Sequence, residues 1–311
     1  MELSIIIPVY NSSEIIPELV SQLKIELLKL GEKFEIILIN DGSRDDSWLT
    51  IEKMILENHE VIGINLMKNF GQHNALLCGI RSAKYETILT MDDDLQHPPT
   101  AIPSLIQKLQ EGHDVVYASP QEEQHGLWRD LASKITKIIL QEAMGVEIAR
   151  KAGAFRIFRT QLREAFSQFD SSFVSIDVLL TWATNRFSNI EIQHFPRKQG
   201  VSNYTFWKLL SHAVNLITGF SVIPLQIASI LGLSGIFFGL AVMVFVLGRY
   251  FAFGGSVPGF PFLASIISIF SGIQLFALGV IGEYLARMHF RIMKKPPYAI
   301  REIAQNVVDP S

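Results

Sequence analysis

The sequence predicts an α/β domain with a mostly parallel sheet, followed by an interfacial amphipathic helix and two transmembrane helices. Apolar segments alternate with helical patterns over residues 1–200, and two long stretches of the last third carry no charged residue. Charged residues make up only 18% of the chain, and the mean hydropathy is +0.27. These values exclude a disordered chain, and a net charge of −3 gives no general attraction for nucleic acid.

The alternation in the first part of the chain predicts the sheet. Apolar segments bounded by turn residues are typical of buried strands, and they are found at Leu3–Val9, Phe34–Asn40, Val61–Leu66, Thr87–Met91 and Asp114–Ala118. Helical patterns lie between them at Ile15–Leu30, Asp45–Leu56 and Ile102–Glu111. Such alternation favours a parallel sheet covered on both faces. Ligands bind such sheets at the carboxyl ends of the strands, so the polar residues that follow each strand are the candidates for a site.

The last third of the chain predicts two membrane spans. Leu209–Gly248 and Tyr250–Gly282 contain no Asp, Glu, Lys or Arg, and about 20 apolar residues are enough to cross a bilayer. We place the spans near Val222–Gly248 and Phe260–Gly282. The alternative is a buried hairpin of a soluble domain, but a soluble helix normally has a polar face, and Ile227–Leu247 offers only two serines.

Basic residues predict how the chain is oriented in the membrane. They precede the first span and follow the second at Arg197, Lys198, Lys208, Arg287, Arg291, Lys294 and Lys295. The connecting loop contains only Arg249, so the positive-inside rule places both termini in the cytosol. The expected domains are a cytosolic catalytic domain over 1–200, a loop and interfacial helix over 201–220, a transmembrane hairpin over 221–286 and a cytosolic basic tail over 287–311.

An apolar stripe with helical spacing predicts the interfacial helix. Its members are Phe206, Leu209, Leu210, Ala213, Val214 and Ile217. Trp207 would then lie at headgroup depth. The alternative is an extension of the first span, although Gly219 and Pro224 separate the stripe from it.

An acidic cluster follows the expected strand Thr87–Met91. If the alternation of the strand continues, Asp92 and Asp94 point to one side and Asp93 to the other, and Gln96 joins the first pair. Carboxylate and amide oxygens are ligands for hard divalent cations such as Mg²⁺ or Mn²⁺, which leave coordination positions for phosphates. The alternative is a solvated turn or a helix N-cap, for which Asp is common.

Other chemistries find less support in the sequence. Neither G-x-G-x-x-G nor the phosphate-loop pattern G-x-x-x-x-G-K-[ST] is present, which argues against a dinucleotide enzyme or an NTPase. The single cysteine, Cys78, excludes a disulfide framework. Asp41 could accept hydrogen bonds from a nucleobase or ribose, although its segment alone is an ordinary turn signal. Asp177 is a further acidic candidate, for which a structural role is the alternative.

The motifs at these strand ends, taken in order, resemble a known family. They are Pro8-Val9-Tyr10-Asn11, Asn40-Asp41-Gly42-Ser43, Asp92-x-Asp94-x-Gln96 and Gly200-x-Ser202-x-Tyr204. The set resembles glycosyltransferases of family 2 that act on polyisoprenyl phosphates, such as dolichol-phosphate mannosyltransferases. With its two spans, the chain looks closest to bacterial undecaprenyl-phosphate glucosyltransferases. The resemblance implies a GT-A-like nucleotide-sugar-binding domain at the bacterial inner membrane.

The resemblance also implies roles for individual residues. Nucleotide binding falls to Pro8, Tyr10 and Asp41. Binding of Mg²⁺ or Mn²⁺ with the diphosphate falls to Asp92, Asp94 and Gln96. The catalytic set is Asp92, Asp94 and Arg197. A loop that closes over the diphosphate contains Gly200, Ser202 and Tyr204, although Asn203 stands where the family usually has Lys.

The acceptor phosphate is placed by the resemblance on Arg129, Ser133 and Arg156. Independently, the segment from Leu127 to Ile139 has the pattern of a basic amphipathic helix, which suits an anionic lipid headgroup. Ala154 stands where the family often has an acidic residue, which removes a candidate base.

The implied reaction is the inverting transfer of a sugar, with UDP-glucose as the first candidate donor, to a polyprenyl phosphate at the cytosolic membrane face. Mannose or another sugar from a different nucleotide is the alternative. A processive polysaccharide synthase is a further alternative, which the missing Q-x-x-R-W motif opposes. A non-enzymatic membrane subunit is the last. Self-association through the span faces and a flippase acting downstream are further expectations about partners, and no nucleic acid is expected.

Overall fold

The computed structural model describes residues 2–120, 153–171, 173–192, 222–253 and 259–306. The chain divides into two compact units, one made of Met1–Phe206 with Lys294–Ser311 and the other of Trp207–Met293. The expected interfacial helix lies outside the described residues. So do Arg129, Ser133, Arg197, Gly200, Ser202 and Tyr204.

Within the described residues, the first unit is built on an eight-stranded sheet with the strand order β7-β5-β6-β4-β1-β2-β3-β8. The strands are β1 Leu3–Val9, β2 Phe34–Asn40, β3 Val61–Leu66, β4 Thr87–Thr90, β5 Val115–Pro120, β6 Arg156–Arg159, β7 Phe187–Ile192 and β8 Ile300–Gln305. The pairs β1–β2, β1–β4, β2–β3 and β5–β7 are parallel. Strands β6 and β8 run antiparallel to their neighbours. The predicted mostly parallel sheet is therefore confirmed.

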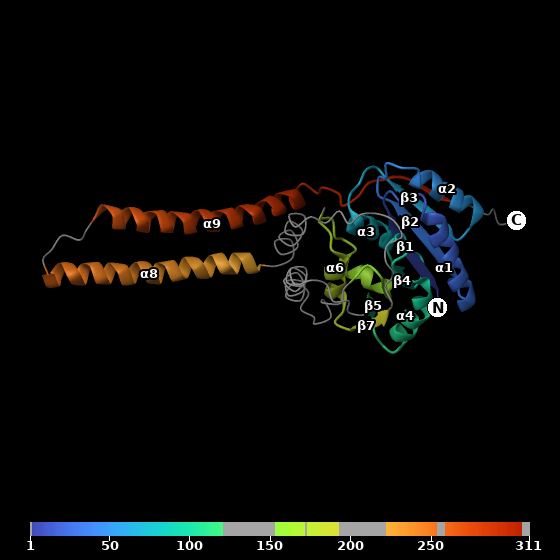
Figure 1. The fold of residues 1–311 in the computed structure, drawn as a ribbon, viewed down its shortest axis with the longest axis horizontal. Coiled ribbons are helices and arrows are strands. Elements are labelled where there is room, and N and C mark those ends of the chain that lie inside the picture. Colours follow the sequence, from blue (N-terminus) through green and yellow to red (C-terminus); the bar gives the residue numbers. More distant parts are fainter. Residues whose placement is uncertain (1, 121–152, 172, 193–221, 254–258, 307–311) are drawn as a thin grey trace. The chain divides into compact units, whose positions relative to one another are not determined.

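Helices cover both faces of this sheet (Figure 1). One face packs against α1 Ile16–Leu30, α2 Ser47–Glu57 and α4 Ile102–Gln110, which follows the short 3₁₀ helix η1 Pro99–Ala101. The other face packs against α3 Gln72–Ser82, α6 Ile176–Ala183 and the 3₁₀ helix η3 Thr160–Phe166. This double cover explains why β1 and β2 are apolar along almost their whole length.

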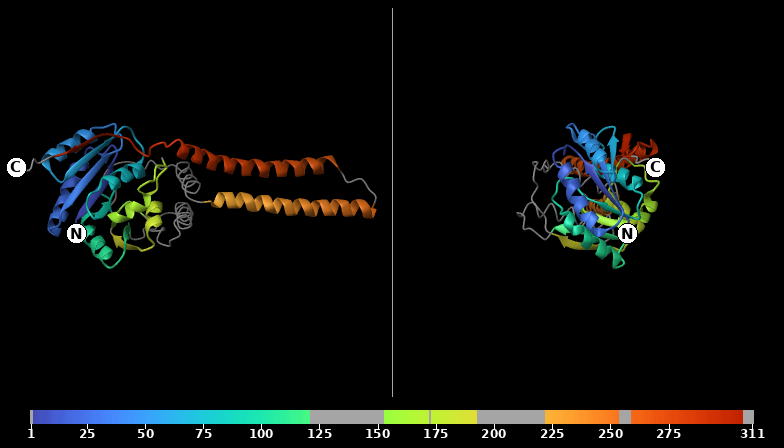
Figure 2. Two further views of the ribbon diagram at one scale, coloured as in Figure 1. Left: turned by 180° about the vertical axis from the view of Figure 1, so that it is seen from behind. Right: turned by 90° about the vertical axis from the view of Figure 1, so that its right-hand side faces the viewer.

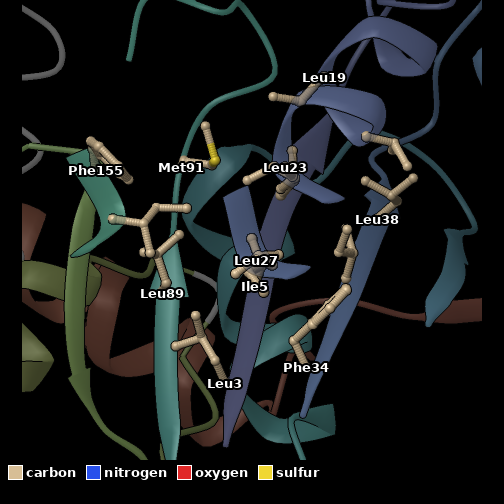
Figure 3. Close-up of a cluster of buried hydrophobic side chains, with 14 of the residues drawn as sticks. Leu3, Ile5, Leu19, Leu23, Leu27, Phe34, Leu38, Leu89, Met91 and Phe155 are labelled. Carbon is tan, nitrogen blue, oxygen red and sulfur yellow. The ribbon is translucent and has the colours of Figure 1, made fainter. Parts of the chain in front are cut away.

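Helix α1 shows how the first face is filled. Its Leu19, Leu23 and Leu27 recur every four residues, so they share one side of the helix and are buried there. Figure 3 shows them directed toward Ile5 of β1 and Leu38 of β2. The core therefore fixes the central strands, whose carboxyl ends carry the motifs singled out above.

The structure differs from the expected elements in three strands and two helices. Strands β6, β7 and β8 and helices α3 and α6 were not predicted. Ile300–Gln305 of the expected basic tail pairs with β3 as the edge strand β8. The tail is therefore not a separate segment, because part of it completes the sheet of the first unit.

The second unit contains helices α8 Ile223–Phe253 and α9 Phe260–Ile292, which lie side by side (Figures 1 and 2). Phe270 of α9 packs against Gly235 and Gly239 of α8. The stretches Ile223–Ala252 and Ile269–His289 are long and apolar enough to cross a membrane, and neither is buried within the protein. Both expected spans are helical, and the helices extend several residues beyond the expected ends.

Candidate functional site

A cavity of about 230 Å³ lies at the carboxyl ends of β1, β2, β3 and β4. The residues that line it are Pro8, Val9, Tyr10, Asp41, Asn69, Gly71, Gln72, Asp92, Asp93 and Asp94. The structure thus brings together the residues predicted for the nucleotide and two of those predicted for the metal. Gln96, the third, is not among the residues that line the cavity.

The loops after β1 and β2 are joined by hydrogen bonds. The backbone N–H of Asn11 donates to Oγ of Ser43 at 3.0 Å, and Oδ1 of Asn11 accepts from the backbone N–H of Arg44 at 2.7 Å. Asn11 has a φ of 54°, a conformation that Asn tolerates better than most residues. These contacts hold the neighbouring Tyr10 at the cavity, where its side chain is 43% exposed.

Asp41 connects the loop after β2 to the loop after β3. Its carboxylate accepts backbone N–H groups at both oxygens, from Phe70 at 2.7 Å and from Gly71 at 2.9 Å. The residue is only 3% exposed, and this burial raises its pKa although the two hydrogen bonds act to lower it. The next residue, Gly42, has a φ of 64°, and a Cβ there would lie 2.4 Å from the backbone nitrogen of Asn69. Only glycine fits this approach of the two loops.

The acidic cluster is arranged differently from the prediction. Asp93 does not point away from Asp92 and Asp94, because all three line the cavity. Strand β4 ends at Thr90, and Leu95 has a φ of 56°, so the alternation of the strand does not continue through the cluster. Asp92 accepts a hydrogen bond from the amide of Gln72.

Asp93 and Asp94 also have backbone partners. Oδ2 of Asp93 accepts from the backbone N–H of Tyr10 at 3.2 Å, and Oδ1 of Asp94 accepts from the backbone N–H of Gln96 at 3.1 Å. The pKa of Asp93 is raised, first by burial and also by the charge of Asp94, although hydrogen bonds from Ser12 and Tyr10 oppose the shift. A cation at this end of the cavity would stabilise the ionised cluster.

The donor groups fit a divalent cation shared with a phosphate ligand. Among the residues that the structure describes, no three His, Cys, Asp or Glu side chains converge into a metal site made by protein alone. Mg²⁺ and Mn²⁺ suit such a place, because they are commonly held by one or two carboxylates together with substrate phosphates. Asp92 and Asp94 at the cavity therefore match the donor set expected for a metal-diphosphate.

The structure gives Arg156 a different environment from the one predicted. The side chain lies in β6, is 1% exposed and forms an ion pair with Asp177 of α6, while its Nε donates to Oγ1 of Thr90 at 3.0 Å. The hydroxyl of Tyr117 donates to the same Asp177 oxygen at 3.0 Å. The buried ion pair gives Arg156 a structural role, and its predicted contact with the lipid phosphate stays a prediction.

Asp177 is likewise a structural residue in this arrangement. Burial acts to raise its pKa, but the positive charge of Arg156 and the hydrogen bonds to Asp177 outweigh burial and lower it. The pair holds α6 against the β4–β6–β5 part of the sheet, since Thr90, Arg156 and Tyr117 are direct partners on these three strands.

The loop between β3 and α3 also belongs to the site, although no sequence motif predicted it. Asn69, Gly71 and Gln72 line the cavity, and the backbone of this loop binds Asp41. The available signal was positional, because Val61–Leu66 is a parallel strand of the same sheet and its carboxyl end lies at the same edge. The residues themselves form no motif that distinguishes them from an ordinary loop.

Comparisons with known proteins agree with this geometry. Residues 4–167 match the family described as Glycosyl transferase family 2. A protein of Shewanella sediminis is 35% identical over 96% of this chain and 92% of its own length, and one of Aeromonas hydrophila is 31% identical over 99% and 95%. Both are named undecaprenyl-phosphate 4-deoxy-4-formamido-L-arabinose transferase. These relatives are named for a sugar other than glucose, so they support the polyprenyl-phosphate transferase family and not a particular likeness to glucosyltransferases.

A solved structure supports the fold. Glucosyl-3-phosphoglycerate synthase from Mycobacterium tuberculosis, in complex with Mn²⁺, UDP and glucosyl-3-phosphoglycerate, aligns with a TM-score of 0.51 over 70% of this chain and 77% of its own, at 13% identity. The identity is too low to transfer a substrate. With the family match and the relatives that span nearly the whole chain, we conclude that this protein is an enzyme that belongs to glycosyltransferase family 2, with a GT-A-like α/β catalytic domain.

Proposed function

We propose that the enzyme transfers a sugar from a nucleoside-diphosphate donor to a polyprenyl phosphate, with undecaprenyl phosphate as the first candidate acceptor. The observation that carries this proposal is the single cavity in which the Tyr10 loop, the Asp41 loop and the Asp92–Asp94 cluster meet. The cavity is lined by an exposed aromatic residue, a buried carboxylate and a cluster of three further carboxylates. This is the arrangement that a nucleoside linked to a metal-bound diphosphate requires.

Each side chain has a role that follows from its chemistry. Tyr10 lines the cavity and is 43% exposed, so a base could stack on its ring. Asp41 orders the loop backbone beside the nucleoside through Phe70 and Gly71. Asp92 and Asp94 would hold Mg²⁺ or Mn²⁺, which when bound supplies positive charge to the leaving diphosphate.

The transfer itself needs little acid–base help from the protein. An oxygen of the lipid phosphate attacks the anomeric carbon, the bond from that carbon to the diphosphate oxygen breaks, and the nucleoside diphosphate leaves. A phosphate monoester has a second pKa of about 6, so the attacking oxygen is already largely ionised at neutral pH. No general base is needed for the attack, and a single in-line displacement inverts the anomeric configuration.

The sugar that we propose first is 4-deoxy-4-formamido-L-arabinose. The relatives from Shewanella sediminis, Pseudomonas aeruginosa and Aeromonas hydrophila carry this sugar in their names and align over 96–99% of this chain. UDP-glucose, which the resemblance of the two-span arrangement to glucosyltransferases favours, is one comparison donor. GDP-mannose is the other.

The acceptor end of the site is proposed from the sequence. Arg129 and Ser133 for the lipid phosphate lie outside the described residues, as do Arg197 and the Gly200–Tyr204 loop for the diphosphate. A polyprenyl chain leaves the bilayer at a cost of about 0.8 kcal/mol per CH₂, so the catalytic domain has to act at the membrane surface. Helices α8 and α9 would anchor it there, with both termini in the cytosol of a bacterium and the enzyme in its inner membrane.

The test is a transfer assay with the full-length enzyme in detergent. Labelled nucleotide sugars are offered with undecaprenyl phosphate and Mg²⁺ or Mn²⁺, and the label is counted in the organic phase. We expect lipid product that disappears with EDTA and in Asp94→Asn, while Asp46→Asn, an exposed carboxylate at the start of α2, stays active. Label in a water-soluble polymer, or unchanged lipid product in Asp94→Asn, would refute the proposal.

A further inference from the structure

A row of polar side chains crosses the sheet from its C-terminal edge strand to the cavity. Asn40 of β2 is the direct partner of Asn65 in β3, and Asn65 is the direct partner of Glu302 in β8. Nδ2 of Asn65 donates to Oε1 of Glu302 at 2.9 Å, and Nδ2 of Asn40 donates to Oδ1 of Asn65 at 2.9 Å. The first and last members of this row are 262 positions apart.

The row ends at the motif that carries Asp41. Oδ1 of Asn40 accepts a hydrogen bond from the backbone N–H of Ser43 at 3.2 Å, which closes the turn Asn40-Asp41-Gly42-Ser43. Oγ of Ser43 in turn accepts from the backbone N–H of Asn11, next to Tyr10. The conformation of two cavity-lining loops therefore depends on the direction in which the Asn40 amide points.

Glu302 and the Ser43 N–H fix that direction together, from the two ends of the row, because the N–H can only donate a hydrogen bond and the carboxylate accepts one. An ionised carboxylate can only accept hydrogen bonds, so Asn65 has to turn its NH₂ group toward Glu302 and its oxygen toward Asn40. Asn40 then has to turn its own NH₂ group toward Asn65, which leaves its oxygen for Ser43. Without the carboxylate, either amide could rotate by half a turn and present the wrong atom.

The two asparagines have no easy replacement for these partners. Asn40 is 4% exposed and Asn65 is 6% exposed, so water has little access to a misdirected amide. A misdirected Asn40 would place its NH₂ group against the Ser43 N–H, and the turn that holds Asp41 would lose its hydrogen bond.

Strand β8 also holds the second loop that contacts Asp41. The backbone N–H of Met67 donates to the carbonyl of Ala299 at 2.9 Å, and the guanidinium of Arg301 donates to the carbonyl of Met67 at 3.3 Å. Met67 leads directly into the loop whose Phe70 and Gly71 N–H groups bind Asp41. Strand β8 and the residue before it are therefore linked to both segments that meet at Asp41, the turn after β2 and the loop after β3.

We propose that Glu302 is a positioning residue for the donor nucleotide, acting through Asn65 and Asn40 on the Asp41 loop. This inference rests on the proposed function, since it concerns the nucleotide side of that same site. The competing interpretation is that β8 only covers the edge of the sheet. The two interpretations differ, because an edge cover contributes to stability alone, whereas a positioning residue contributes to nucleotide affinity.

The experiment compares Glu302→Leu and Glu302→Gln with Gln305→Leu, a control on the same strand, in the full-length enzyme. Glu302→Leu should raise the KM for the donor and weaken binding of Mn²⁺-UDP, measured by calorimetry without acceptor, by about tenfold, the size of one hydrogen bond to a charged group. The kcat and the KM for the lipid should stay within about twofold, well below that tenfold change. Glu302→Gln should recover part of the affinity, because its amide oxygen can still accept from Asn65.

A readout independent of transfer separates the two proposals. Hydrogen–deuterium exchange over residues 40–44 should rise in Glu302→Leu and not in Gln305→Leu. If the wild-type enzyme transfers no sugar, the proposed function fails, and exchange still decides the role of Glu302. Equal exchange in the two leucine variants, or a lower melting temperature in Glu302→Leu with unchanged nucleotide affinity, would overturn the positioning role.

Discussion

Tyr10 and Asp93 are joined by a hydrogen bond of 3.2 Å from the backbone N–H of Tyr10 to the Asp93 carboxylate, although 83 positions separate them. The bond fastens the loop after β1 to the acidic loop after β4. The sequence suggested that Asp93 points away from its neighbours, and its contact with Tyr10 explains why it lines the cavity instead. It also gives this carboxylate a role distinct from that of Asp92 and Asp94.

The raised pKa of Asp93 predicts a pH-dependent stability in the absence of metal. Because the folded-state pKa lies above the unfolded value of about 3.9, folding favours the protonated form. Its contribution to stability is present below that value and is lost as the pH rises through the folded pKa. Relative to Asp93→Asn, the wild type in EDTA should become less stable as the pH rises from about 4 to 7, which denaturant titrations would measure. A constant difference over this range would contradict the prediction.

Gly42 should be intolerant of a side chain, and Gly31 provides the matched control. Both have positive φ, but a Cβ at Gly42 meets the backbone of Asn69, whereas nothing lies within 4 Å of one at Gly31. Gly31→Ala should cost about 1–2 kcal/mol of stability, the strain of the left-handed conformation, without changing the donor KM. Gly42→Ala should cost more and also raise the donor KM, since the Asn69 loop has to shift. Equal donor KM values in Gly31→Ala and Gly42→Ala would show that the Asn69 loop does not shape the nucleotide site.

Tyr10 should contribute to binding through its ring. Stacking of a base on an aromatic side chain is worth about 1–3 kcal/mol, so Tyr10→Ala should weaken binding of the nucleotide by about 5- to 150-fold. Tyr10→Phe keeps the ring and the backbone N–H that donates to Asp93, so this variant should bind the nucleotide as tightly as the wild type does. Calorimetry with UDP and Mn²⁺ would measure both. Strong loss in Tyr10→Phe would instead indicate a role for the hydroxyl.

The buried pair of Arg156 and Asp177 should matter for stability rather than for the acceptor. Asp177→Asn leaves the Arg156 charge without its carboxylate and should cost about 3–5 kcal/mol at neutral pH. The folded pKa of Asp177 is lowered, so its contribution is present above about pH 4 and is lost as the pH falls through the folded pKa. The difference between wild type and variant in thermal unfolding should therefore shrink on acidification.

A double variant provides the control for this pair. Replacing both residues by leucine removes both charges, so the cost should be smaller than the sum of the single changes. If Arg156 bound the lipid phosphate, its conservative change to Lys would raise the KM of the lipid with little effect on stability.

The two apolar helices predict firm membrane attachment. The enzyme should stay in the membrane fraction after a carbonate wash and should leave it in detergent, because α8 and α9 expose apolar side chains along their length. The substitution Phe238→Asp, at the middle of α8, should lower membrane insertion, whereas Leu56→Asp at an exposed position of α2 should not. Release of the wild type by carbonate would contradict the assignment of spans.

The sequence predicted most of the elements whose signal is local. Strands β1, β2 and β3 were predicted with the bounds that the structure shows, because mostly apolar runs between turn residues have few other interpretations. Helix α3 was missed because its first turn is polar and the six residues after it are all buried, so it shows no amphipathic pattern. Strand β8 was missed because its side chains are mostly exposed, so it carries no hydrophobic pattern.

The sequence by itself determined the fold class, the two apolar helices and the ordered motifs that identify the family, since these depend on periodicity and on short segments of chain. Tertiary structure decided which side chains meet. In the folded protein Asp93 lines the cavity and Arg156 forms an ion pair with Asp177. Glu302 lies beside Asn65, although 237 positions separate them in the sequence. Packing of the whole sheet sets the direction of a side chain that follows the end of a strand, and it also sets which residue of a distant strand becomes its partner. Neither property leaves a local pattern in the sequence.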